Sequence, residues 1–335
     1  MLLTIALLTK NSEDTVRYAL KSILKQNIPL GAALELIVID GYSTDNTLKI
    51  VEDAIGKLRA RFNHQFVRHV IRQERVSIGY ARNLALKETS GDWILWVDSD
   101  NVLAQDYISK ALQEIEKCKD MKTAVLYPFK VITIPRDNNL ASKLIMCYGI
   151  LQSYPSQQLR GLAEKLIRKE PIQKILPYTA MQGSLCKTSA LRAVGGFNNC
   201  LLAAEDIDVY LRILNQGFSM RAFNSTLYSF SRRTLSAWFK QAMLWGYGKE
   251  LMQIHGSNFP RNRKAQRLSI DSLVYNLIIH TLMLLLLSLV KGVKVCGVLG
   301  LLMPLLYIYR RSGYIKGYLC ASEKIQKRVR RIDPS

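Results

Sequence analysis

The chain has 335 residues, enough for one large domain or two ordinary domains, each with its own apolar core. It carries 47 Lys and Arg against 26 Asp and Glu, a formal net charge of +21, so we expect an anionic partner: nucleic acid, acidic lipid or nucleotide phosphate. The six cysteines form no CxxC pair and the four histidines match no zinc spacing, which argues against a disulfide framework and a histidine metal cluster.

The first hundred residues alternate between apolar runs and amphipathic segments. Residues 3–9, LTIALLT, form a continuous apolar run typical of a parallel strand that is covered on both faces. Ser12 stands as the N-cap of a following helix, with Glu13 and Asp14 in its first turn. Further strands are predicted at 34–40, 64–72 and 92–98, and further helices at 43–58 and 78–89. Such alternation with short loops predicts an α/β open sheet.

The middle of the chain is less regular. Its pattern predicts a helix over 103–118 and a strand over 123–134. Residues 156–170 read as a basic amphipathic helix, either an ordinary surface helix or one that lies on a membrane or over a substrate. In a helix predicted over 234–248, Trp238 and Trp245 are either core residues or an interfacial anchor.

From Leu273 the chain becomes strongly apolar. Residues 273–290 run for 18 positions without a charge, and at about 1.5 Å per residue such a helix could just span a bilayer core. A second apolar stretch covers 295–309, and basic residues flank the pair on both outer sides. The positive-inside bias predicts a transmembrane helical hairpin with both ends in the cytoplasm, and two in-plane helices or a buried core hairpin are the alternatives.

These patterns divide the chain into four parts and place it at the cell membrane. We predict an α/β domain over 1–225, an amphipathic juxtamembrane segment over 226–269, a membrane hairpin over 270–311 and a basic cytoplasmic tail over 312–335. The α/β domain then lies on the cytoplasmic face, with membrane lipids as partners. The positive charge gathers around the apolar tract and is not interleaved with aromatic residues, so no nucleic-acid partner is expected.

Two aspartates, Asp98 and Asp100, follow the apolar strand WILWVD. They form either an ordinary turn or a metal site, because carboxylates at the carboxyl edge of an open sheet lie where such sheets bind ligands. Oxygen ligands suit Mg²⁺ or Mn²⁺, which share substrate phosphates. Asp40 ends an earlier strand, where it can accept hydrogen bonds from a ribose or a base.

Three further positions carry charge that chemistry could use. Arg82 opens a predicted helix and is either an anion-binding residue or a surface salt-bridge arginine. Glu205 and Asp206 begin another helix, as dipole complements or as a base that deprotonates an attacking hydroxyl. Arg232 and Arg233 could neutralise a leaving diphosphate or hold an acidic acceptor.

The order of these motifs resembles the family-2 glycosyltransferases of the GT-A fold, over roughly residues 2–250. The resemblance rests on LLTKNSEDTVRYALKSILKQ, ELIVIDGYSTDNTLKI, GYARNLAL, GDWILWVDSD, QGSLCKTSALRAVGGFN and EDIDVYLRILNQGF. It implies a Rossmann-like mixed sheet that binds a UDP- or GDP-sugar with Mn²⁺ or Mg²⁺ and inverts the anomeric centre in a single displacement.

The resemblance also implies roles for individual residues. Thr9 and Asp40 would contact the base and ribose, and Arg82 the ribose or diphosphate. Asp98 and Asp100 would form the DxD motif, with Asp100 the more direct metal ligand, and Asp206 would be the general base. The family's usual DDGS is DGYS here, with Tyr42 where a small residue is usual.

The QxxRW motif of processive synthases is absent, which favours addition of one sugar at a time. With the hairpin, this predicts a lipid-linked acceptor, such as a polyprenyl or dolichyl phosphate or a lipid-linked glycan. A transferase that builds a polysaccharide or acts on a soluble acceptor, with the hairpin as a simple anchor, is the alternative. A non-catalytic nucleotide-binding membrane scaffold is a more distant one.

Overall fold

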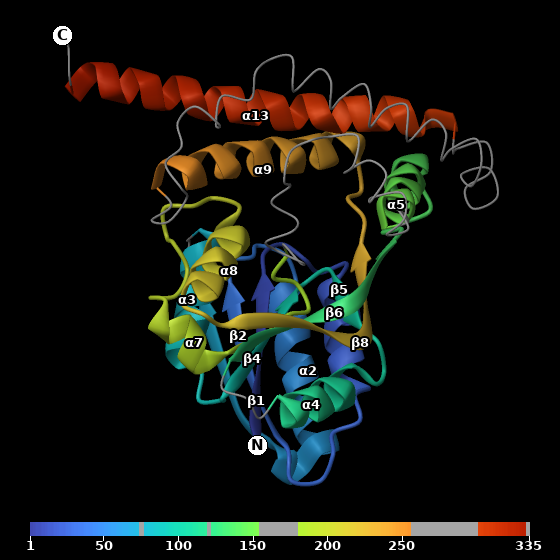
Figure 1. The fold of residues 1–335 in the computed structure, drawn as a ribbon. Helices are drawn as coiled ribbons and strands as arrows, with labels where there is room; N and C mark the ends of the chain where they lie inside the picture. Colours follow the sequence, from blue (N-terminus) through green and yellow to red (C-terminus); the bar gives the residue numbers. More distant parts are fainter. Residues whose placement is uncertain (74–76, 119–121, 154–179, 256–300, 333–335) are drawn as a thin grey trace. The chain divides into compact units, whose positions relative to one another are not determined.

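The computed structural model describes residues 1–73, 77–118, 122–153, 180–255 and 301–332, shown as coloured ribbon in Figure 1. The chain forms two compact units. The first comprises Met1–Ile132 and Pro171–Phe230, and the second Thr133–Glu170 and Ser231–Ser335.

The first unit is built on a mixed eight-stranded sheet of order β3-β2-β1-β4-β7-β6-β8-β5. Parallel pairing joins β1 to both β2 and β4, and β2 to β3, whereas β7 pairs antiparallel with β4 and β6. The strands are β1 (Leu2–Thr9), β2 (Ala33–Asp40), β3 (Phe66–Gln73), β4 (Trp93–Asp98), β5 (Asn101–Leu103), β6 (Thr123–Ile134), β7 (Leu185–Lys187) and β8 (Ser219–Phe230).

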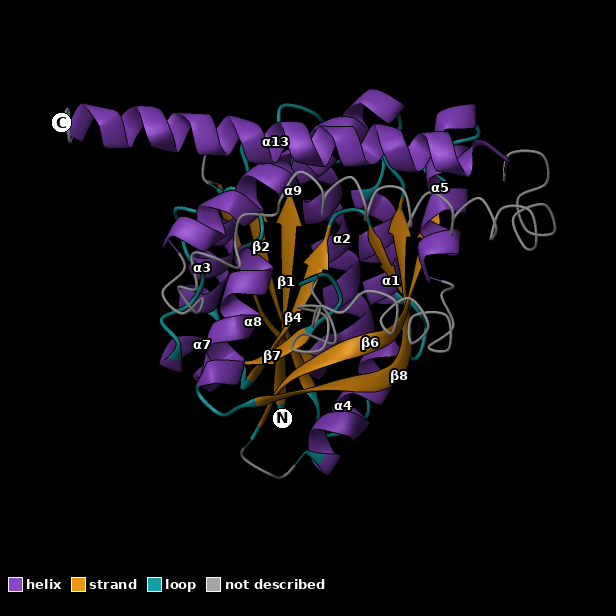
Figure 2. Ribbon diagram, turned by 45° about the horizontal axis from the view of Figure 1, so that its top comes forward, coloured by secondary structure: helices purple, strands orange, loops and turns teal. Residues whose placement is uncertain are grey.

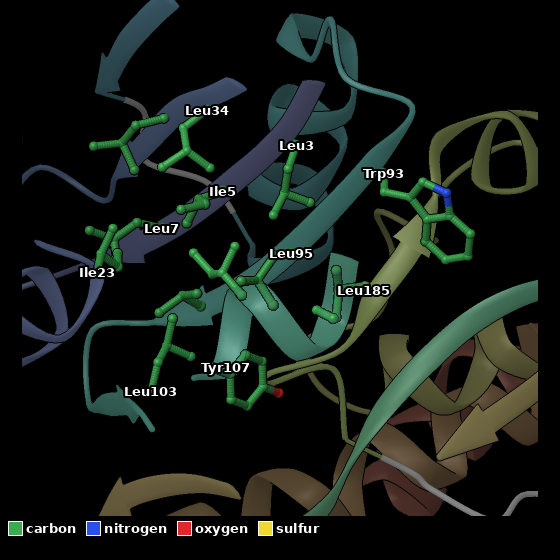
Figure 3. Packing of buried hydrophobic residues seen from close by; sticks show 14 of the residues in the cluster. Leu3, Ile5, Leu7, Ile23, Leu34, Trp93, Leu95, Leu103, Tyr107 and Leu185 are labelled. Carbon is green, nitrogen blue, oxygen red and sulfur yellow. The ribbon is translucent and has the colours of Figure 1, made fainter. Parts of the chain in front are cut away.

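Helices cover both faces of this sheet (Figure 2), and most residues of its central strands are accordingly apolar. Leu3, Ile5 and Leu7 of β1 point to one face and pack with residues of α1 (Val16–Leu24), α2 (Thr47–Phe62) and α4 (Tyr107–Lys117); Figure 3 shows part of this cluster. The opposite face holds Ala6, Ile37 and Trp96 with residues of α3 (Ile78–Glu88), α7 (Thr188–Ala193) and α8 (Glu205–Asn215).

The strands and helices predicted over residues 3–134 are confirmed, with local corrections at three helix starts, since α2 begins at Thr47 and not at 43. Ser12 is not the N-cap of α1, which begins at Val16 after Thr15. The Ser12 hydroxyl instead donates to the Lys10 carbonyl at 2.8 Å and accepts from the Ser99 hydroxyl at 2.8 Å, and the Ser12 N–H donates to the Thr47 hydroxyl at 2.8 Å, so Ser12 joins neighbouring loops. The helix predicted over 103–118 begins at Tyr107, because Asn101–Leu103 forms β5 and pairs with β8.

The second unit contains α5 (Leu140–Ser153), α9 (Leu235–His255) and α13 (Met303–Ile332). Glycines bring α9 and α13 close together: a side chain at Gly246 would meet the Tyr314 backbone, and one at Gly317 the Met243 backbone. Trp238 is buried at 4% exposure, whereas Trp245 is 42% exposed, so only the first is a core residue.

The predicted membrane hairpin, 270–311, lies largely outside the described residues, as does the basic helix predicted over 156–170. Within the described ranges, no helix combines the length and apolar character needed to cross a bilayer. The predicted boundary at 311 falls inside α13, which runs on to Ile332.

Candidate active site at the carboxyl edge of the sheet

Three predicted site residues end neighbouring parallel strands. In the sheet register Thr9 pairs with Asp40, and Leu8 pairs with both Ile39 and Asp98. The ends of β2, β1 and β4 therefore lie side by side. The chain reverses its direction of travel across the sheet at β1, and this is the point at which open α/β sheets bind ligands.

Asp40 is fully buried and is bound by its neighbours. Its Oδ1 accepts hydrogen bonds from the Thr9 hydroxyl at 2.8 Å and from the Ser43 hydroxyl at 2.6 Å, and its Oδ2 accepts from the Ser43 N–H at 2.8 Å. Thr9 is itself only 5% exposed. Asp40 thus shapes the β2–α2 loop, while its predicted contact with a base or ribose stays a prediction.

The loops after β1 and β2 are joined to each other by hydrogen bonds. The Asn11 N–H donates to Ser43 Oγ at 2.8 Å, and Asn11 Oδ1 accepts from the Thr44 N–H at 2.9 Å. Glu13 adds bonds in both directions: its N–H donates to Asp45 Oδ2 at 3.1 Å, and its Oε2 accepts from the Asn46 N–H at 3.0 Å. These hydrogen bonds hold the two loops against each other at the carboxyl ends of β1 and β2.

Asp98 and Asp100 are positioned by a buried amide, Asn101, which sequence reasoning did not identify. Asn101 Oδ1 accepts from the Asp98 N–H at 3.0 Å, and its Nδ2 donates to Asp100 Oδ1 at 3.2 Å and to Gln182 Oε1 at 3.2 Å. Asn101 has no exposed surface. The geometry of the two aspartates therefore depends on a residue that itself is out of reach of solvent.

The chemistry of this pair fits a divalent cation. Both aspartates are half-buried, and their carboxylate oxygens are ligands that Mg²⁺ and Mn²⁺ prefer. Across the described parts of the chain, no group of three or more His, Cys, Asp or Glu side chains is arranged so that the group alone could hold a metal ion. A cation here would thus be held by Asp98 and Asp100, with phosphate oxygens or water as its other ligands.

Arg82 of α3 lies between Asp98, at the end of β4, and Glu205, at the start of α8. It is 3% exposed, forms an ion pair with Glu205, and has Nη2 3.8 Å from Asp98 Oδ1. Its guanidinium also lies over the rings of Trp96 and Phe197, at 6.0 and 5.7 Å. Burial acts to lower the pKa of Arg82, but the neighbouring carboxylates overcome this and raise it above its usual value. Arg82 thus stays charged and faces protein acids.

Glu205 and Asp206 begin α8 directly after Ala204, whose φ of 64° turns the chain into the helix. Glu205 is buried against Arg82, while Asp206 is half-buried. Burial and the charge of Glu205 raise the pKa of Asp206 to about 7, against the opposing effects of Arg82 and of the Ile207 N–H. A carboxylate with such a pKa is suited to take a proton near neutral pH.

Asn83 fixes the loop that leads to α8. Like the role of Asn101, this role was not evident from the sequence. Its side chain donates to the Phe197 carbonyl at 2.8 Å and accepts from the Phe197 N–H at 2.8 Å, and it also donates to Asn199 Oδ1 at 2.7 Å. The neighbouring Gly196 has φ of 70°, and a side chain there would collide with the Asn83 amide. Arg82 and Asn83 together tie α3 to the α8 region.

Arg232 and Arg233 belong to the second unit. Arg233 Nε is 3.3 Å from Asp137 Oδ2, and the Arg232 carbonyl accepts from the Ser142 hydroxyl at 3.4 Å. Their predicted contact with a diphosphate or acidic acceptor stays a prediction.

Comparison with known proteins identifies the family. The profile of glycosyl transferase family 2 matches residues 4–175, and that of glycosyl transferase family group 2 matches residues 163–315. The chain therefore belongs to glycosyl transferase family 2. It shares 33% identity over 109 residues with the poly(ribitol-phosphate) beta-N-acetylglucosaminyltransferase TarS of Staphylococcus aureus, covering 32% of this chain but only 18% of TarS.

Two further similarities extend over more of the chain. A Methanococcus voltae enzyme, dolichyl N-acetyl-alpha-D-glucosaminyl phosphate 3-beta-D-2,3-diacetamido-2,3-dideoxy-beta-D-glucuronosyltransferase, is 21% identical over 75% of this chain and 73% of its own length. The structure of the mannosyltransferase PcManGT from Pyrobaculum calidifontis, in complex with GDP-Man and Mn²⁺, aligns with a TM-score of 0.56 at 17% identity, over 93% of this chain and 86% of that one. The predicted mixed α/β fold of GT-A type is confirmed.

Proposed function

We propose that the protein is a metal-dependent, inverting glycosyltransferase that transfers one sugar from a UDP- or GDP-sugar. The observation that carries this proposal is the link through Arg82, which contacts both Asp98 of the DxD pair and Glu205 beside Asp206. One ion-pair network thus joins the residues suited to a metal–diphosphate with the residue suited to deprotonate an acceptor. A neighbour of the same fold has been determined with GDP-Man and Mn²⁺, which supports a nucleotide sugar and a divalent cation here.

In the proposed reaction, Asp98 and Asp100 would hold Mn²⁺ or Mg²⁺, whose positive charge would offset that of the donor diphosphate. Asp206 accepts the proton of the acceptor hydroxyl while that oxygen forms a bond to C1 of the sugar. The bond from C1 to the diphosphate oxygen breaks with its electron pair, and the nucleoside diphosphate leaves with inversion at C1. Arg82 and Glu205 act as positioning residues that hold the start of α8 in place.

We infer a lipid-linked acceptor from one relative of this chain and from the exposed apolar residues of α13. The Methanococcus voltae relative is named for a dolichyl-linked acceptor and matches three quarters of this chain. A polymer acceptor is the second candidate, because the TarS relative is named for poly(ribitol-phosphate) and a further relative is a chondroitin synthase, 28% identical over 207 residues. The chain spans only 18% and 26% of these two proteins.

The exposed side of α13 supports a membrane partner. Six large apolar side chains are 37–64% exposed on this helix and just before it: Leu301, Leu302, Leu305, Ile308, Tyr309 and Leu319. Residues 301–332 also contain eight basic residues and one acidic residue. Apolar surface next to excess positive charge is the combination that binds anionic lipid surfaces, so we propose that the protein works at the cytoplasmic face of the cell membrane.

A vesicle-binding assay tests whether the protein binds membranes through α13. The full chain should float with vesicles of phosphatidylcholine and phosphatidylglycerol, and a Leu305→Asp, Ile308→Asp variant should bind them at least several-fold more weakly. Phe129→Asp is the matched control, because Phe129 is 76% exposed in the first unit. Equal loss in both variants, or no flotation of the wild-type chain, would refute the membrane proposal.

The activity itself is tested with a panel of nucleotide sugars, Mn²⁺ and membranes that contain lipid-linked acceptors. We expect transfer from one class of donor and loss of at least a hundredfold in Asp100→Ala and Asp206→Ala. Transfer to a short water-soluble saccharide that equals transfer to lipid-linked acceptors would favour the polymer alternative.

A further inference from the structure

Arg310 of α13 is surrounded by aromatic rings. Its guanidinium carbon lies 5.3 Å from the centre of the Tyr148 ring, 5.2 Å from that of Trp238 and 4.9 Å from that of Trp245. Tyr148 belongs to α5 and the two tryptophans to α9, so three helices of the second unit meet at this cation. Aromatic rings attract a cation through their electron-rich faces but carry no net charge, so Arg310 keeps its positive charge.

The hydroxyl of Tyr148 does not neutralise this charge either. It accepts a hydrogen bond from Arg310, and burial raises the pKa of Tyr148 to about 12 against the opposing charges of Arg310 and Arg311. Tyr148 therefore stays protonated and neutral near pH 7. Because Arg311 also acts on this hydroxyl, the two neighbouring cations share one electrostatic environment around Tyr148.

Neither arginine has a carboxylate partner among the residues that the structure describes. In the described part of the second unit, the ion pair that forms joins Arg233 to Asp137. α5 contains no acidic residue, and α9 and α13 contain one each. Both Arg310 and Arg311 are half-buried, and Arg311 has a buried Nε that donates to no acceptor. Cations withdrawn from water without an anion are unfavourable, so a bound anion would stabilise this pair.

The surface around the two arginines indicates that the anion is carried by a lipid. Trp245 is exposed beside Arg310, and Leu305, Ile308 and Tyr309 are exposed just before it on α13. Tryptophan and tyrosine favour the level of the lipid headgroups in a membrane. Arginine binds phosphate oxygens through two parallel N–H bonds. A free phosphate ion could contact the arginines but would leave the apolar side chains in water.

We propose that Arg310 and Arg311 form a binding site for the phosphate group of a membrane lipid. The phosphate supplies the negative charge that the described protein residues do not, and the exposed apolar side chains of α13 contact the rest of the lipid. This inference rests on the proposed membrane binding of α13 and makes it specific. General attraction to an anionic surface needs only positive charge, whereas this site needs guanidinium groups at positions 310 and 311.

Arg311→Lys separates the two cases, because it keeps the charge and removes the two-pronged contact. We expect it to raise the dissociation constant of the full chain for vesicles of phosphatidylcholine and phosphatidylglycerol about tenfold. Lys316→Gln is the control: Lys316 is exposed on the same helix, and loss of its whole charge should weaken binding by no more than about fivefold. The melting temperature of Arg311→Lys without lipid should equal that of the wild type.

A second measurement distinguishes lipid phosphate from free phosphate without vesicles. Dihexanoyl-phosphatidylglycerol below its micelle concentration should raise the melting temperature of the wild-type chain by about 2 °C. Inorganic phosphate at equal concentration and ionic strength should not, and Arg311→Lys should lose the shift. The wild-type comparison needs no variant, so it tests the site even if Arg311→Lys folds poorly.

Three results would overturn the inference and leave the membrane proposal standing. These are equal vesicle binding by the wild type and Arg311→Lys, a larger loss in Lys316→Gln than in Arg311→Lys, and equal melting shifts with the short lipid and inorganic phosphate. Failure of the wild-type chain to bind vesicles would instead refute the membrane proposal, and the melting shift with the short lipid would then decide the arginine site by itself.

Discussion

Arg82 and Glu205, 123 residues apart in the sequence, form a buried ion pair that joins α3 to the first residue of α8. Neither side chain is more than 5% exposed. The same guanidinium lies 3.8 Å from Asp98, so one cation is shared between the end of β4 and the start of α8. The arrangement makes the position of Asp206 depend on Arg82.

Removal of one partner of this pair should destabilise the protein strongly. Arg82→Met leaves Glu205 buried without its counter-ion, which we expect to lower the free energy of unfolding by about 3–5 kcal/mol. Urea unfolding followed by circular dichroism measures this. The double variant Arg82→Met, Glu205→Met should recover most of the stability but not the transferase activity.

The pair Arg72–Glu88 is the control for this prediction. Its N–O distance is 2.9 Å, but the Arg72 side chain is 53% exposed. Arg72→Met should therefore cost less than about 1 kcal/mol. Equal effects of Arg72→Met and Arg82→Met would mean that the buried pair does not hold α8.

Divalent-metal binding should depend on Asp100 and not on nearby surface acids. We expect Asp100→Asn to weaken Mn²⁺ binding in the presence of UDP by at least tenfold, because it removes an anionic oxygen ligand. Electron paramagnetic resonance of free Mn²⁺ gives the affinity directly. Asp106→Asn is the control, since Asp106 is 49% exposed and pairs with Lys110. Unchanged affinity in Asp100→Asn would place the metal elsewhere.

Asn101 should affect metal affinity without touching the metal. Its amide holds the Asp98 backbone and the Asp100 carboxylate, and such supporting partners typically change affinity by about 10–100-fold. We expect a loss of this size for Asn101→Ala in the same Mn²⁺ titration. Ser229→Ala should have little effect, because its hydroxyl is 3.5 Å from the Asn101 amide. An Asn101→Ala variant with normal Mn²⁺ affinity would contradict this role.

Acid should inactivate the enzyme through Asp206. Its pKa is raised to about 7 by burial and by Glu205, and the base works only when ionised, so kcat/KM should fall about tenfold per pH unit below 7. The folded pKa lies above the usual value of 3.8, so the folded state binds more protons than the unfolded state between these values. The stability from protonated Asp206 is therefore complete below pH 3.8 and is lost as the pH rises to 7.

Asp206→Asn checks both consequences. The variant should lack the acidic limb in whatever activity it retains, and its stability should vary less between pH 4 and 7 than that of the wild type. Activity profiles and thermal unfolding across this range provide the data. A wild-type profile that is flat down to pH 5 would exclude Asp206 as a base with this pKa.

The sheet edge could be predicted from sequence because its signals are local. The apolar runs that end in Asp40 and Asp98 indicate buried parallel strands, and parallel order alone brings their ends to one edge. Glu205 and Asp206 were identifiable as the start of a helix by the same kind of local pattern.

The contacts between these signals could not be predicted, because they join distant parts of the chain. Nothing near Arg82 in the sequence indicates Glu205 as its partner, and Asn101 resembles an ordinary loop residue although it is completely buried. Ser12 shows why a local pattern can fail. Its sequence fits an N-cap, but its hydroxyl donates to the Lys10 carbonyl and accepts from the hydroxyl of Ser99, 87 residues later, and the helix starts at Val16.

The proposed function requires that Asp206 acts as the general base when sugar is transferred at the carboxyl edge of the sheet. The most direct measurement is the rate of transfer from a saturating nucleotide sugar with Mn²⁺ for the full chain and for Asp206→Asn, with Asp208→Asn as control because Asp208 pairs with Arg212 at 2.7 Å. We predict wild-type transfer, at least a hundredfold loss in Asp206→Asn, and unchanged donor binding in that variant. Wild-type transfer rates in Asp206→Asn would contradict the claim.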